Sequence, residues 1–189
     1  MSVTVIEPST AAVTLVEAKA ALLVDHDADD VYIQSLIDAA NEEAEIAAGR
    51  SFVSRTLEMA LDAWPADGVI RLEHPPVQSI TSITYYDEAN VEYTMPSTDY
   101  VAITDIGIPV IALGHGASWP SATLRRAAPI RVRYVAGYGD AHDVPARYRQ
   151  LILALVAVDY ENREGMNNVA SAQRERVLNA LSMEWGWAT

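Results

Sequence analysis

The sequence contains no cysteine, only one lysine and no hydrophobic run long enough to cross a membrane. The absence of cysteine excludes disulfide bonds, thiolate metal ligands and cysteine nucleophiles together, and it suits assembly in a reducing cytoplasm. A membrane-spanning helix needs about 20 consecutive apolar residues, and the N-terminal residues lack the basic region of a signal peptide. We therefore expect a cytosolic, soluble protein without a membrane partner.

The charge of the chain is strongly negative and unevenly placed. The 189 residues have a formal net charge of −13. Residues 1–95 hold 17 acidic against 4 basic side chains, whereas residues 96–189 hold 9 of each, and every base except Lys19 is arginine. Such a chain is a poor binder of duplex DNA, because affinity for the phosphate backbone needs cationic contacts. The acidic half either keeps the protein soluble or meets the arginine-bearing half of a neighbour.

Helical periodicity is clear at both ends of the chain. Thr14 and Glu17 form a capping-box pattern that predicts a helix over 15–23. An acidic stretch then precedes apolar positions spaced three and four residues apart, which predict a helix over 30–48 that Gly49 ends. Two further helices are predicted near the C-terminal end, over 145–163 and 171–181.

Between these helices the periodicity changes to alternation. Residues 56–136 contain short runs in which apolar and polar residues alternate, separated by turn residues such as Asp87–Asn90. The fold class predicted is α+β: a mostly helical bundle of about four helices with a central antiparallel β region of short strands and hairpins. Residues 1–12 are expected to form a flexible arm, 13–182 a single domain and 183–189 an aromatic tail.

The sequence shows no catalytic or cofactor-binding motif. Its four histidines lie outside metal-ligand spacings, and the segment Gly114–Ser118 lacks the lysine that completes a phosphate-binding loop. The acidic segments Asp25–Asp27 and Asp140–Asp143 are interpreted as helix-leading segments rich in capping residues. We therefore predict no catalytic residue, no cofactor and no metal site.

Several segments, in their order and spacing, together resemble a known family. They are TLVEAK at 14–19, VDHDADD at 24–30, AGR at 48–50, AWP at 63–65, RL at 71–72, PPVQSI at 75–80, YYD at 85–87, RVRYVAGYG at 131–139, VP at 144–145 and YENRE at 160–164. With this pattern the chain resembles the head-tail connector, or adaptor, proteins of long-tailed phages and gene transfer agents. The resemblance covers about residues 13 to 182.

The resemblance implies a structural subunit and no catalytic residues. Such a subunit binds below the portal ring in the neck of the virion, matches its twelve-fold symmetry and extends the DNA channel towards head-closure or tail proteins. DNA passes through the lumen without specific binding, and the particle is assembled in the cytoplasm of the bacterial host. The C-terminal segment reaches the portal in this family, which makes Arg174, Arg176, Trp185 and Trp187 the portal-contact candidates. The two tryptophans alternatively pack back onto their own domain.

A ring also requires contacts between its subunits. A head-to-tail ring repeats one contact and so needs two different complementary surfaces on each subunit. The two surfaces are expected to carry Arg131 and Arg133 on one side and Asp27, Asp29 and Asp30 on the other. A different neck component, such as a head-closure or tail-completion protein, is the main alternative function. A carboxylate-dependent hydrolase of the particle is the less favoured one.

Overall fold

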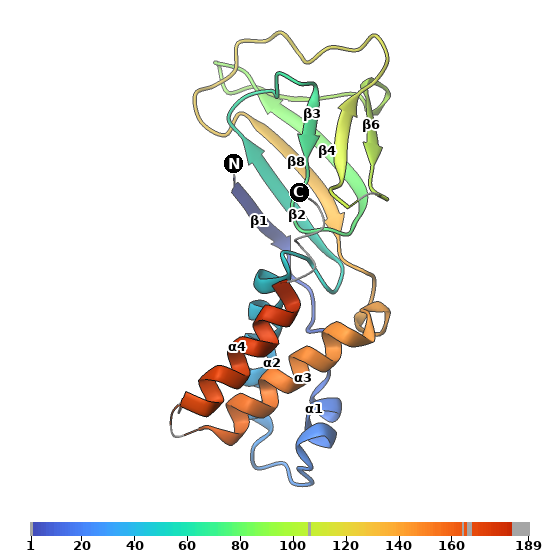
Figure 1. Ribbon diagram of the computed structural model, residues 1–189. Coiled ribbons are helices and arrows are strands. Elements are labelled where there is room, and N and C mark those ends of the chain that lie inside the picture. Colours follow the sequence, from blue (N-terminus) through green and yellow to red (C-terminus); the bar gives the residue numbers. More distant parts are fainter. Residues whose placement is uncertain (1, 106, 164, 166–167, 183–189) are drawn as a thin grey trace. The chain divides into compact units, whose positions relative to one another are not determined.

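The protein folds into two compact units that alternate along the chain. The computed structural model describes residues 2–105, 107–163, 165 and 168–182. One unit consists of Met1–Ser9 and Ser54–Tyr138, and the other of Thr10–Val53 and Gly139–Thr189. The chain therefore passes from one unit to the other three times, as the sequence colouring of Figure 1 lets the reader follow. We call them the sheet unit and the helical unit.

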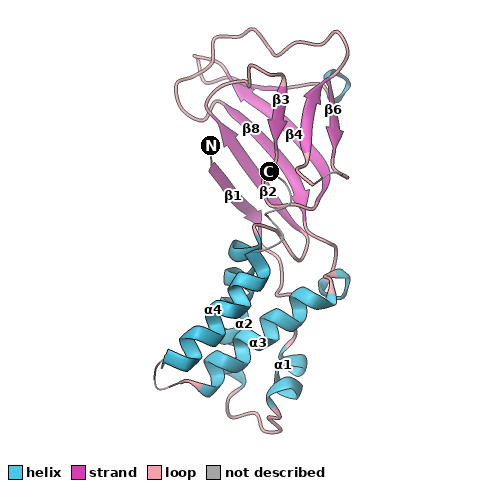
Figure 2. Cartoon of the chain, in the orientation of Figure 1, coloured by secondary structure: helices cyan, strands magenta, loops and turns pink. Residues whose placement is uncertain are grey.

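The sheet unit contains two antiparallel sheets (Figure 2). The larger sheet has the strand order β1 (Ser2–Glu7), β2 (Arg55–Leu61), β8 (Ile130–Ala136), β4 (Val77–Tyr86) and β5 (Glu92–Thr94). The smaller sheet has the order β3 (Val69–Arg71), β7 (Val110–Leu113) and β6 (Tyr100–Ile103). Strand β8 thus pairs with β2 on one side and with β4 on the other, which places it at the centre of the larger sheet.

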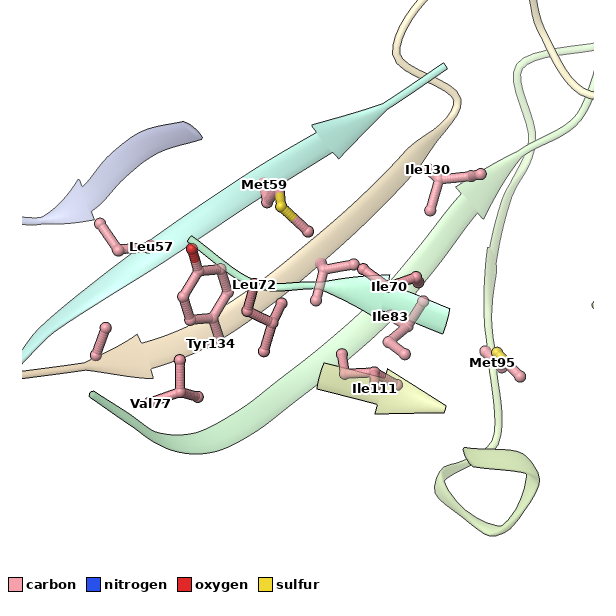
Figure 3. Packing of buried hydrophobic residues seen from close by; sticks show 12 residues of the cluster. Leu57, Met59, Ile70, Leu72, Val77, Ile83, Met95, Ile111, Ile130 and Tyr134 are labelled. Carbon is pink, nitrogen blue, oxygen red and sulfur yellow. The ribbon is translucent and has the colours of Figure 1, made fainter. Parts of the chain in front are cut away.

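The core of the sheet unit follows from the alternation of residues along its strands. Successive side chains of a strand point to opposite faces, and in β8 Ile130, Val132 and Tyr134 all point into the core, where none is exposed. Ile70 of β3 and Ile111 of β7 join the same cluster from the smaller sheet (Figure 3). The core therefore lies between the two sheets, and the other face of the larger sheet is left for polar residues.

Among the described residues, the helical unit contains four α-helices (Figure 1). They are α1 (Leu15–Leu22), α2 (Asp30–Ala48), α3 (Ala146–Glu161) and α4 (Asn168–Ser182). Both α1 and α4 pack against α2 and α3, but in the described part of the chain they make no extensive contact with each other. The pair α2 and α3 therefore forms the centre of the unit, with α1 and α4 as its flanks. No helix among the described residues combines the length and apolar content needed to span a bilayer.

Local sequence explains the ends and the centre of these helices. The Thr14 hydroxyl accepts a hydrogen bond from the Glu17 amide at 3.2 Å, and the Glu17 carboxylate accepts one from the Thr14 amide at 2.8 Å. This is the capping box that starts α1. The second helix ends at Gly49, whose left-handed backbone is the usual stop signal. In the core, the Phe52 ring stacks on Tyr148 with 4.9 Å between ring centroids.

The predicted fold class is confirmed, because the chain combines four helices with antiparallel sheets of short strands. The predicted flexible arm over 1–12 needs a correction. Residues 2–7 form β1, which pairs with β2 through contacts such as Val3 with Met59. The partner of β1 is the strand β2, which lies about 50 residues away in the sequence, so no local pattern predicts their pairing.

The domains predicted from the sequence overlap only in part with the two units. The predicted β region over 56–136 falls inside the sheet unit. The predicted single domain over 13–182 contains residues of both units, because helical segments lie on either side of the β region in the sequence. The predicted aromatic tail over 183–189 lies outside the described residues.

Candidate interaction surfaces

The outward face of the larger sheet carries a buried carboxylate between two arginines. Glu58 of β2 is only 9% exposed. Arg133, its cross-strand neighbour on β8, donates a hydrogen bond to Glu58 Oε2 at 2.8 Å, and Arg131 donates one to Oε1. The two arginine side chains remain 44% and 39% exposed. One carboxylate is thus saturated by two cations that still present part of their surface to solvent.

The ionisation of Glu58 depends on these two partners. Burial alone raises its pKa, but the hydrogen bonds from Arg133 and Arg131 outweigh burial, so that the net pKa is lowered. The carboxylate is therefore charged at neutral pH. Nearby, the Arg125 guanidinium lies over the Tyr86 ring at 4.0 Å from its centroid, a cation–π arrangement. The face is consequently polar, and its charged groups Glu58, Arg131 and Arg133 are paired with one another.

Several acidic residues of the first half of the chain pair with arginines of the second half. The ion pairs of this kind are Glu17 with Arg149, Asp29 with Arg163, Glu43 with Arg174, and Glu58 with Arg131 and Arg133. The uneven charge of the sequence is therefore partly neutralised inside the subunit. These pairs contain four carboxylates and five arginines, so the net charge of −13 arises from acidic groups outside them.

The acidic residues predicted to contact a neighbouring subunit cluster around α1 and the start of α2. Lys19 binds both Asp27 and Asp30, each at 2.7 Å, and Asp29 binds Arg163 at 2.8 Å. Hydrogen bonds from these cations lower the pKa of Asp27 and of Asp29. Asp27 keeps most of its side chain in solvent, whereas Asp29 and Asp30 are less exposed. The predicted role of these residues and of the sheet arginines between subunits stays a prediction.

The four portal-contact candidates are in different situations. Arg174 is engaged inside the helical unit, where its Nε donates to Asp159 at 3.1 Å and its terminal nitrogens bind Glu43. Arg176 is exposed on α4 and has no ion-pair partner among the described residues. Trp185 and Trp187 lie outside the described residues. The portal contact of these four residues stays a prediction.

The structure also reveals an exposed apolar face on α1 that sequence reasoning did not assign. Val16 and Leu23 are 77% and 92% exposed, while Ala18 on the opposite side of the helix is buried. The available signal was composition: the segment from Leu15 to Leu23 is apolar on all sides except at Glu17 and Lys19. A helix without a polar face has more apolar surface than one core contact needs.

One acidic cluster resembles a cation site in composition. Ligand atoms of Asp140, His142 and Asp143 lie within 4.8 Å of one another, and all three residues are exposed. The Asp140 amide donates to Asp143 Oδ2 at 2.9 Å, which completes a capping box at the turn before α3. The segment therefore caps the short 3-10 helix Ala141–Asp143, whereas α3 begins after Pro145 without a side-chain cap.

Comparison with known proteins identifies similar chains over nearly the whole length. The model of the phage gp6-like head-tail connector protein family matches residues 12–105. A chain in the neck of an empty GTA particle, computed with C6 symmetry, is 23% identical with a TM-score of 0.77, over 94% of this chain and 95% of that chain. A chain in the virion of a native gene transfer agent (GTA) particle is 25% identical with a TM-score of 0.76, over 93% and 94% of the two chains.

A third similar chain belongs to the neck of a native GTA particle, computed with C12 symmetry. It is 23% identical with a TM-score of 0.74, over 94% of both chains. None of the curated proteins compared with the sequence matches it. The fold described above is therefore shared, across both of its units, with chains of these particles.

Proposed function

The chain belongs to the phage gp6-like head-tail connector family and is a structural connector subunit, and from this premise we propose that it forms one segment of a ring between the portal and the tail of a phage-like particle. The observation that carries the proposal is the family match over residues 12–105, joined to a fold shared over about 94% of the chain with a neck protein. The virion neck is the proposed location, after assembly in the cytoplasm of the host.

A twelve-membered ring is the proposed assembly. The similar neck structures were computed with six-fold and twelve-fold symmetry, and a cyclic arrangement repeats one head-to-tail contact between identical subunits. The subunit has the separate flanks that such a contact requires, because α1 and α4 lie on different sides of the α2–α3 pair. Symmetry matching with a twelve-fold portal gives the copy number.

The DNA channel is proposed to pass through this ring without specific binding. The net charge of −13 repels the phosphate backbone, and like charge keeps the DNA from adhering to the wall as it slides. The cationic groups that would oppose this effect are largely committed to carboxylates of the same chain, as in the Glu58 cluster. No catalytic role is proposed, since a connector acts by holding its neighbours.

The portal contact is proposed to involve the segment that follows α4. Trp185 and Trp187 offer large apolar surface with few torsions to immobilise, which is the character of residues that dominate interfaces. The opposite side of the ring would then receive a head-closure or tail protein. This part of the proposal follows the family resemblance.

Light scattering coupled to size-exclusion chromatography tests the proposed function. The protein is measured alone and after mixing with the purified portal ring of the same particle. The expected result is a portal complex that carries about a dozen added copies, as symmetry matching requires. A chain that binds a tail protein and leaves the portal unbound would instead be a head-closure or tail-completion component. Hydrolysis of peptidoglycan by the purified protein would contradict the non-enzymatic assignment.

A further inference from the structure

The exposed face of α1 has the pattern of a helix that packs against another helix. Val16 and Ala20 are spaced four residues apart, so they lie along one side of α1, and Leu23 follows at the cap that ends the helix. All three are exposed, and Val16 and Leu23 are among the most exposed large apolar residues of the described chain. The small Ala20 between two larger residues leaves room for a second helix to approach. Among the described residues, no other element of the helical unit covers these side chains, as their exposure shows.

Leu23 sits in a backbone conformation that glycine or asparagine adopts more easily. Its φ and ψ angles are 58° and 36°, in the left-handed region. Gly49 occupies the same position at the end of α2 with 59° and 32°. In both helices this residue and the next donate backbone hydrogen bonds to carbonyls three and five residues earlier. The C-terminal ends of α1 and α2 therefore have the same capping motif. At the position where this motif favours glycine, α2 has Gly49 and α1 has Leu23.

In the described part of the chain, the Leu23 side chain makes no extensive contact that would offset its unfavourable backbone conformation. It is 92% exposed, so it contributes almost no burial of apolar surface to folding. A residue that is unfavourable for the backbone and exposed in the isolated subunit indicates a contact made elsewhere. The acidic residues Asp25 and Asp27 are also exposed and follow it directly, which gives the apolar face a negatively charged end.

The other flank of the helical unit carries a face of complementary character. On α4, Val169, Ala172 and Arg176 are spaced three and four residues apart and all are exposed, with Val169 at 68%. Arg176 has no ion pair among the described residues, and it is the cation of this face. The neighbouring Glu175 lines a separate hollow with Arg174 and Asp159. One flank therefore ends in acidic residues and the other presents an arginine.

We propose that the α1 face of one copy packs against the α4 face of the next copy around the ring. The α1 face is defined by Val16, Ala20 and Leu23. Both faces have alanine at the centre, which permits the short interaxial distance of packed helices, about 8–10 Å. Because the two faces lie on different flanks, the contact is head-to-tail and repeats from copy to copy. This inference rests on the proposed ring, and it assigns Arg176 to the neighbouring copy rather than to the portal.

The substitution Leu23→Asn separates assembly from folding. Asparagine tolerates the left-handed conformation, so the variant is expected to unfold at the same or a higher temperature than the wild type. It removes the apolar side chain from the contact, so ring formation on the portal is expected to need about tenfold more protein, the loss that follows from one buried leucine. The control is Ile46→Asn, which removes an exposed apolar side chain from α2 of the same unit.

A second substitution acts on the opposite face. Arg176→Glu places a negative charge against Asp25 and Asp27, and it is expected to weaken ring formation without lowering the unfolding temperature. Rings of Leu23→Asn and Arg176→Glu that form at the wild-type concentration would overturn the proposed contact while leaving the connector function intact. A wild-type protein that forms no ring on the portal would instead refute the proposed function, and with it this contact. Light scattering and calorimetry on the full chain supply both measurements.

Discussion

Replacing Glu58 with glutamine tests whether the buried carboxylate stabilises the sheet unit. The change removes the charge and turns one of the two acceptor oxygens into an amide donor, so one of the hydrogen bonds from Arg131 and Arg133 is lost. A hydrogen bond to a charged group contributes about 1.5–3 kcal/mol when it is buried. Since both arginines are about 40% exposed, solvent screens part of this value. The expected loss at neutral pH is about 1–2 kcal/mol.

The same substitution predicts a pH dependence with a definite sign. The pKa of Glu58 in the folded protein lies below its ordinary value of 4.5. A carboxyl group of this kind contributes stability that is fully present above the unfolded pKa and is lost as the pH falls through the folded pKa. The free-energy difference between wild type and Glu58→Gln should therefore be constant from neutral pH down to about 5.5 and shrink below about 4.5.

Urea unfolding followed by near-ultraviolet circular dichroism measures this difference. The rings of Trp64 and Trp119 stack at 4.7 Å within the sheet unit, and this pair provides a signal from the unit that contains Glu58. Glu88→Gln, at an exposed position of the same unit, is the matched control and should leave stability unchanged. A Glu58→Gln variant as stable as wild type at neutral pH would refute the reasoning, as would a difference that persists unchanged in acid.

Three further substitutions address the helical unit. Phe52→Ala removes the buried ring that stacks on Tyr148 and should lower the free energy of unfolding by about 3–4 kcal/mol. Calorimetry measures this loss, and a value below about 1 kcal/mol would contradict the packing described. Thr14→Ala removes the hydroxyl that caps the Glu17 amide and should lower the free energy of unfolding by about 1 kcal/mol. Thr14→Ser keeps the hydroxyl and should be as stable as wild type in the same urea titration. Arg174→Gln should lower the unfolding temperature at low salt and have less effect at high salt, because its partners are carboxylates; an effect independent of salt would argue for packing alone.

The secondary structure was predictable because its signals are local. The helix predicted over 30–48 coincides with α2, and Asp87–Asn90 does form the turn between β4 and β5. In these places the cap, the stop signal and the turn residues lie next to the element that they define. β1 was missed because its pairing partner is distant in sequence. The division into two units was missed because segments of both alternate along the chain.

The interaction surfaces were less predictable than the fold. Arg131 and Arg133 were expected to face a neighbouring subunit, but each binds Glu58 of the same chain, more than 70 residues away in the sequence. Only the register of β2 on β8 brings them together, and register depends on the whole sheet. The exposure of Leu23 was equally hidden, since a leucine in an apolar run is usually a core residue. Composition reveals which residues can interact, and the tertiary structure decides whether the partner is internal.

The alternation of the two units along the chain has a consequence for synthesis. Helices α1 and α2 leave the ribosome directly after β1, but the residues that complete their core begin only at Gly139. The intervening segment Ser54–Tyr138 contains 85 residues, which takes roughly 4–17 s to translate at usual bacterial rates. The sheet unit is thus fully synthesised before α3 and α4, the helices that pack against α1 and α2, have been translated. A chain whose translation stops before α4 lacks the α4 face. It therefore cannot complete the proposed contacts with the neighbouring copies of the ring.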